Sequence, residues 1–106
     1  MTNKSCAIES LLHIIGQRWN AYILWILHQH SSMRFGNLKR NIPGISQKVL
    51  TAKLRELESY GIITRVYEKT VPPTVHYSLS TQALDLIPVM QHINQVAIIW
   101  REKGIL

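Results

Sequence analysis

The sequence predicts an α+β fold that is mostly helical, and two observations lead to this prediction. Apolar residues recur at helical spacing over most of the chain. Only between residues 62 and 79 does the spacing change to the alternation that is typical of strands. With 106 residues, 46% of them hydrophobic, the chain has the length of one domain and enough apolar content for a core. We therefore expect a single domain over residues 1–106.

The first two expected helices lie on either side of a glycine. Ala7 to Ile15 has apolar residues at helical spacing and stops at Gly16. From Trp19 to His30, apolar residues cover more than one side of the helix. Because a helix that is apolar on several sides is usually enclosed by the rest of the fold, we expect this second helix to be buried.

A third helix and a fourth are expected on either side of a turn. The third runs over about residues 35–41 and is closed by the Pro43-Gly44 turn. Ser46 can cap the fourth helix, which covers about residues 46–60 and stops at Gly61.

The fourth helix is expected to have one apolar and one polar side. Placing its residues at 100° intervals gathers on one arc Val49, Leu50, Leu54, Leu57 and Tyr60. Lys53 falls on this apolar side, where we expect its stem to pack while its ammonium group reaches solvent.

Alternating residues predict a two-stranded hairpin over about residues 62–79. The link between the strands runs from Thr70 to Thr74 and contains Pro72 and Pro73, which lack amide donors and stiffen the backbone. We therefore expect this link to form a projecting loop.

The last expected helix covers about residues 81–103. It carries a heptad seam of apolar residues at Leu86, Met90, Ile93, Ala97 and Trp100. A second apolar stripe lets one face cover the core while another meets a partner. Because Pro88 falls within this segment, we expect a kink there or a later helix start.

The basic residues are concentrated in the middle of the chain. The formal net charge is +6, and residues 34–69 contain eight basic but only three acidic side chains. A polyanion is the expected partner, either nucleic acid or an anionic membrane surface. No apolar run is long enough for a transmembrane helix and no signal peptide is evident, so we expect a cytoplasmic protein that is not inserted in a membrane. A single cysteine agrees with a reducing compartment.

The order of the expected elements is the layout of a helix-turn-helix followed by a wing. In this arrangement the second helix of the motif enters the major groove of double-stranded DNA. Its polar side would contact bases or phosphates through Ser46, Gln47, Lys48, Thr51, Ala52 and Arg55, with Ala52 against a thymine methyl group. Phosphate contacts are expected from Arg34, Lys39, Arg40, Arg65 and Lys69.

Other functions fit the same pattern of charges. The polar side of the helix is a solvated surface in the simplest interpretation, and a winged helix can also serve as a non-enzymatic module that binds an acidic protein. An enzyme is disfavoured because no catalytic set is visible: Asp85 is the only aspartate and there is no glycine-rich phosphate loop.

Several segments together resemble the HxlR-type family of bacterial winged helix-turn-helix transcription regulators, from Cys6 to about Trp100. They are Gly16–Trp19, Arg34–Leu38, Ile42–Thr51, Leu54–Glu58, Gly61–Ile63 and Val71–Leu79. The chain departs from the family where Gln17-Arg18 replaces the usual Gly-Lys, and at His76 and Ala83, where the family often has Glu and Gly.

The resemblance implies a homodimeric DNA-binding regulator related to the MarR group, with long terminal dimerisation helices. Its operator would be roughly palindromic. The family pairs its subunits through the first and last helices, which here would place at the dimer interface Ile8, Leu11, Leu12, Met90, Ile93, Ala97 and Trp100.

Cys6 matches an N-terminal cysteine that several family members use to sense oxidants, quinones or other electrophiles. A thiol in the first turn of a helix also lies at the positive end of the helix dipole, which favours the reactive thiolate. The alternative is a small, buried apolar residue without reactivity. The effector expected from the first interpretation is a small oxidant or electrophile.

No metal site and no cofactor are expected. His28 and His30 are two positions apart, so on a helix they point to different sides and do not form a chelating pair. Trp19, Trp25 and Trp100 are interpreted as core or interface residues, although a cleft between the dimer helices would also suit a small aromatic ligand.

Overall fold

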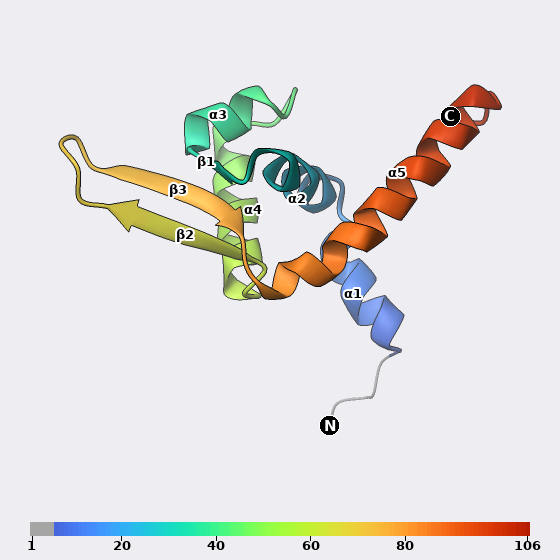
Figure 1. Cartoon of the computed structure of the whole chain (residues 1–106), viewed down its shortest axis with the longest axis horizontal. Coiled ribbons are helices and arrows are strands. Elements are labelled where there is room, and N and C mark those ends of the chain that lie inside the picture. The colour runs from blue at the N-terminus through green and yellow to red at the C-terminus, as the bar shows by residue number, and fades with distance from the viewer. Residues whose placement is uncertain (1–5) are drawn as a thin grey trace.

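The computed structural model describes residues 6–106, which form a helical body, a hairpin wing and a long C-terminal helix (Figure 1). The α+β class that the sequence predicts is confirmed. The elements follow one another as α1 (Ala7–Ile15), α2 (Arg18–His30), β1 (Ser32–Met33), α3 (Phe35–Arg40), α4 (Gln47–Ser59), β2 (Ile63–Glu68), β3 (Thr74–Leu79), the 3-10 helix η1 (Gln82–Asp85) and α5 (Leu86–Glu102).

Helix α2 lies at the centre of the core, as its apolar surface predicts. Ile23, Leu24 and Leu27 are almost completely buried. The buried side chains that pack around them are Met33, Leu38, Ile42, Ile45, Leu50, Leu54, Leu57, Ile62, Ile63, Ala83 and Leu86. Among residues 6–106, Asn20 is the one polar side chain that is buried with them.

The sheet contains a third strand that the sequence pattern does not predict. β1 pairs antiparallel with β3, placing Ser32 opposite Ser78 and Met33 opposite Tyr77, and the strand order is β1-β3-β2. A strand of two residues is too short to show alternation, which is why the pattern misses it. This pairing fixes the wing to the chain segment between α2 and α3.

The turn between α3 and α4 depends on Gly44. Its φ angle is +89°, and a Cβ atom at this position would lie 4.0 Å from the ring of Trp19. A left-handed backbone favours glycine because side chains at such φ values are strained. The turn therefore packs directly beside the start of α2.

Both ends of α4 agree with the sequence-based expectation. The Ser46 hydroxyl oxygen accepts a hydrogen bond of 3.1 Å from the Val49 amide and caps the helix. At the other end, Gly61 has φ +73°, and the Ile62 amide donates to the Leu57 carbonyl at 3.0 Å. The left-handed Gly61 and this hydrogen bond together give a carbonyl at the end of the helix a partner that the helix itself does not provide.

The C-terminal segment is divided into two helices. The expectation of one helix over residues 81–103 is wrong in its first turn, because residues 82–85 form η1 and α5 begins at Leu86. Pro88 then lies in the first turn of α5, where its missing amide costs no intrahelical bond. The later start that Pro88 predicts is confirmed. No helix within residues 6–106 has the length and hydropathy needed to cross a bilayer.

Lys53 is not placed as the sequence predicts. Its side chain is half-buried, and its ammonium group donates to the Gln17 side-chain oxygen at 2.6 Å instead of reaching freely into solvent. The expectation is wrong because the α1–α2 corner, far away in sequence, covers this part of α4.

Candidate nucleic-acid interface

Helix α4 has two faces with opposite character. Leu50, Leu54 and Leu57 are buried against α2 and the sheet. Tyr60, which the sequence places on the same arc, is 42% exposed because it is the C-cap residue at the end of the helix. The other side, which we call the outer face, lines a shallow open groove of about 520 Å³ with Gln47, Lys48, Thr51, Ala52 and Arg55. The structure therefore brings together five of the residues that the sequence predicts for DNA contact.

Ser46, the sixth of these residues, is exposed but its hydroxyl oxygen is already occupied by the cap of α4. This bond fixes where the helix begins. Since Gln47 and Lys48 follow directly, the cap also fixes how the first turn presents their side chains.

The basic residues of α3 lie at the surface of the helix-turn-helix. Lys39 and Arg40 are exposed in the last turn of α3. The Arg40 guanidinium hydrogen bonds to the side-chain oxygen of Asn37 within the same helix, so part of its donor capacity is used internally. Lys39 forms no ion pair among residues 6–106.

The wing carries exposed basic residues on β2 and at its end. Arg65 lies opposite Tyr77 in the sheet, and Lys69 follows the last residue of β2. Both side chains are exposed. Within the described part of the chain, neither takes part in an ion pair.

Arg34 lies beside the wing, although the sequence places it in the helix-turn-helix. It occupies the N-cap position of α3 and shares a surface groove of about 290 Å³ with residues of both wing strands and their loop. This proximity follows from the β1–β3 pairing, which the sequence does not reveal.

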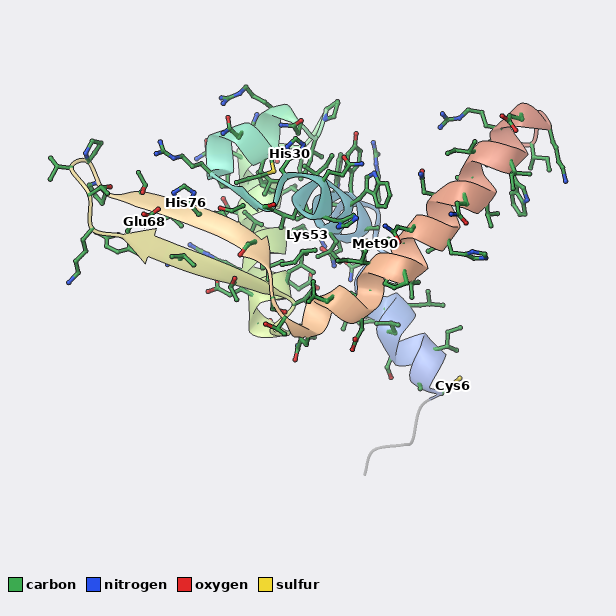
Figure 2. All side chains as sticks on the ribbon, viewed as in Figure 1. Cys6, His30, Lys53, Glu68, His76 and Met90 are labelled. Carbon is green, nitrogen blue, oxygen red and sulfur yellow. The ribbon has the colours of Figure 1, made fainter. Side chains whose placement is uncertain are left out.

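A histidine–carboxylate contact on the wing is missed by the sequence analysis. The His76 side-chain Nε2 lies 2.8 Å from a carboxylate oxygen of Glu68. In Figure 2 these side chains project from the two strands toward each other. The strand register is the signal that finds this contact, because Glu68 pairs with Thr74 and His76 is two residues away on the same face.

The apolar residues predicted for the dimer interface form an uncovered surface on the single chain. α1 has no buried residue, and Ile8 is 63% exposed. On α5, Ile93 is 58% exposed, while Met90 and Ala97 are half-buried. Leu11, Leu12 and Trp100 are also exposed. The outer half of α5 extends away from the helical body (Figure 1).

A groove of about 340 Å³ lies between α2 and α5 at the base of this surface. Three residues predicted for the dimer interface line it from the α5 side, Met90, Ile93 and Ala97, and α2 contributes Tyr22 and Trp25. The groove is therefore continuous with the expected subunit contact.

Cys6 is the N-cap residue of α1, and its side chain is exposed. The interpretation as a small buried residue is therefore wrong for the single chain. Its carbonyl oxygen accepts hydrogen bonds from the amides of Glu9 and Ser10, at 3.0 and 3.2 Å. The thiol thus lies at the beginning of the helix whose apolar side chains are uncovered.

Within residues 6–106, no three His, Cys, Asp or Glu side chains come close enough together to hold a metal ion. His28 and His30 lie in the last turn of α2, and His28 packs against the Trp25 ring with 5.9 Å between ring centres. This contact assigns His28 to packing.

Comparisons with known proteins agree with this architecture. The model of the HxlR-like helix-turn-helix family matches residues 14–104. The HTH-type transcriptional regulator YdeP of Bacillus subtilis is 39% identical over 100 residues, which cover 94% of this chain and 74% of that protein.

Solved structures of regulators are similar as well. The redox regulator HypR in its reduced form has a TM-score of 0.85 and 32% identity, covering 91% of this chain and 94% of that one. A MarR-family regulator from Enterococcus faecalis has a TM-score of 0.82 and 30% identity, covering 98% and 94% of the two chains.

Proposed function

The chain belongs to the HxlR-like helix-turn-helix family of transcription regulators, and on this premise we propose that it binds a pseudo-palindromic operator as a homodimer. In this proposal α4 enters the major groove and the wing lies along the adjacent backbone. Each subunit reads one half-site.

The outer face of α4 is the observation that carries the proposal. Its polar and basic side chains are presented to solvent on a helix whose other side is anchored in the core. Gln47 has a donor and an acceptor and Arg55 has paired donors that can recognise base edges, and Ala52 provides a methyl group for thymine. Thr51 and Lys48 suit either bases or phosphates.

Phosphate contacts are assigned to basic residues that flank the outer face. Lys39 and Arg40 lie on the helix before the turn, and Arg34, Arg65 and Lys69 lie on or beside the wing. Phosphate contacts fix the orientation of a protein on the duplex and contribute salt-dependent affinity.

The homodimer is supported by the uncovered apolar surface of α1 and α5. Large exposed apolar patches on a small protein usually mark an interaction site. A second copy of the chain is the simplest partner, because a palindromic operator requires two recognition helices related by symmetry.

A fluorescence-anisotropy titration tests the proposal. The labelled duplex is the region upstream of the protein's own gene, with random duplex as competitor, at low and at moderate salt. We expect binding that survives competition and weakens with salt. Equal affinity for both duplexes contradicts operator recognition, and the absence of duplex binding favours a module that binds an acidic protein.

Oxidant sensing by Cys6 is a second candidate function. The exposed thiol lies at the start of α1, next to the apolar surface assigned to the dimer, and the similar protein HypR is a redox regulator. In the sensing reaction, two Cys6 thiols from two subunits lose two protons and two electrons to the oxidant and form one disulfide; alternatively, Cys6 forms a mixed disulfide or an adduct.

The experiment for Cys6 compares the wild type with Cys6→Ser in the same titration after diamide treatment. We expect diamide to change the operator affinity of the wild type only. Non-reducing gel electrophoresis distinguishes a disulfide between subunits from an adduct. An equal change in both proteins excludes Cys6 as the sensor.

A further inference from the structure

Four polar side chains connect the corner between α1 and α2 with α4. Gln17 and Asn20 belong to the corner, and Lys53 and Glu56 belong to α4. We call these residues the corner cluster. Figure 2 shows Lys53 projecting from α4 at the side where α2 crosses it.

The corner residues are first tied to the end of α1. The Gln17 side-chain amide donates to the His13 carbonyl at 2.7 Å, and the Asn20 amide donates to the Ile14 carbonyl at 2.9 Å. Both acceptors are in the last turn of α1, whose carbonyls lack intrahelical partners. The two side chains therefore fix the direction in which α1 leaves α2.

The same two side chains also hold α4. The Lys53 ammonium group donates to the Gln17 side-chain oxygen at 2.6 Å. The Asn20 amide and the Lys53 ammonium group both approach one carboxylate oxygen of Glu56, at 3.4 and 3.5 Å. Each corner residue thus contacts α1 and α4 at once.

Partial burial makes these contacts costly to break. Asn20 is 0% exposed, and the side chains of Lys53 and Glu56 are 25% and 29% exposed. A buried polar group that loses its partner is not fully compensated by water. The Asn20 side-chain oxygen has no partner among residues 6–106, so the hydrogen bonds of this buried side chain are made by its amide nitrogen.

The corner cluster lies on the same rigid helix as the outer face. Lys53 and Glu56 alternate along α4 with Thr51 and Arg55, on different sides of the helix. The contacts that hold Lys53 and Glu56 therefore bear on the orientation of the outer face as a whole.

We infer that Gln17 and Asn20 are positioning residues for DNA recognition, which set the orientation of α4 through Lys53 and Glu56. This inference rests on the proposed function, because it assigns a role in operator recognition to residues that do not touch DNA. Because Gln17 and Asn20 also bind carbonyls of α1, the inference links the position of the end of α1 to the orientation of α4.

Operator binding by matched variants tests the inference. Gln17→Leu removes both hydrogen bonds while keeping the size of the side chain, and Lys53→Met removes the ammonium group. We expect each variant to weaken operator binding by about five- to tenfold and random-duplex binding by less than about twofold. The double variant should lose less affinity than the sum of the two single losses, because both variants remove the hydrogen bond between Gln17 and Lys53.

Two further variants provide controls. Gln17→Glu keeps an acceptor for Lys53 but loses the donor to the His13 carbonyl, so its operator affinity should lie between that of Gln17→Leu and that of the wild type. Lys103→Met removes one positive charge at the exposed end of α5 and should leave the discrimination between duplexes unchanged. Additive losses in the double variant, or equal losses on both duplexes, overturn the inference.

Hydrogen exchange of the free protein gives a measurement that does not depend on DNA. In Gln17→Leu, amides of residues 47–59 should exchange faster than in the wild type, while those of residues 86–102 stay unchanged. Unchanged exchange in α4 overturns the inference. If the wild type itself does not prefer the operator, the proposed function fails, and the exchange result still decides whether the corner holds α4.

Discussion

Basic side chains of similar chemistry have different surroundings in this protein. Lys53 is half-buried and bound to Gln17, whereas Arg55 and Lys69 are exposed. The net charge of the chain counts each of these side chains equally as a possible contact for an anion. Their contacts separate residues that hold the fold from residues that are available to an anion.

Replacing Arg55 by Ala should weaken operator binding more than random-duplex binding. A guanidinium that bonds two acceptors on a base edge discriminates by about 1–3 kcal/mol, which is about five- to 150-fold in affinity. Because the Arg55 side chain is exposed, the free energy of unfolding should change little. Anisotropy titrations with both duplexes and a urea denaturation curve measure the two quantities.

Lys69→Ala provides the contrasting variant on the wing. A lost phosphate contact should weaken binding to both duplexes equally and lower the slope of log affinity against log salt by about 1. If Arg55→Ala gives this same uniform effect, Arg55 contacts phosphate and does not read bases.

The outer face of α4 was predictable residue by residue, because its position depends only on the helical period. The placement of Lys53 and the contact between His76 and Glu68 were not. Each depends on which segments pack together or on the register of two strands, and a single sequence pattern does not contain this information.

At the scale of elements, local signals locate most boundaries. Ser46 and Gly61 mark the two ends of α4 through a cap and a left-handed turn, both of which are local chemistry. β1 is different, because its two residues become a strand only by pairing with β3. Sequence patterns therefore predicted the hairpin but not its attachment to the helical body.

The cap of α4 should contribute measurably to stability. Replacing Ser46 by Ala removes the acceptor for the Val49 amide and should lower the free energy of unfolding by about 1 kcal/mol. The control is Ser10→Ala, at an exposed position inside α1, which should change stability by no more than about 0.5 kcal/mol. Urea denaturation compares the two, and equal stabilities would show that the cap contributes nothing.

At the scale of the whole molecule, the single chain leaves much of its C-terminal helix uncovered. Val89, Ile98 and Ile99 are exposed on α5 together with Ile93 and Trp100 of the predicted seam. The heptad spacing predicted that one face of the helix would contact a partner. The spacing does not determine which residues of the seam are buried in the core of the single chain. Leu86, at the start of the seam, is buried within the chain, and Ile93 is not.

Ile93→Asp should give a folded monomer. The exposed position tolerates the charge in the single chain, but a buried, unpaired carboxylate in a dimer interface is unfavourable. Light scattering after size exclusion should show the mass of one chain, and operator affinity should fall. Gln95→Asp introduces the same charge at an exposed polar position of α5 and should remain dimeric. A dimeric Ile93→Asp variant would place the subunit contact elsewhere.

The division of α4 into two faces has a consequence for the evolution of this protein. Because the outer face contributes almost nothing to the core, its side chains are free to vary while the leucines behind them stay the same. With the outer face in its proposed role, a gene duplication followed by a few substitutions there would yield a regulator of different genes without a new fold. The same property makes the chain a scaffold that an engineer can retarget by exchanging the outer-face residues of one relative for those of another.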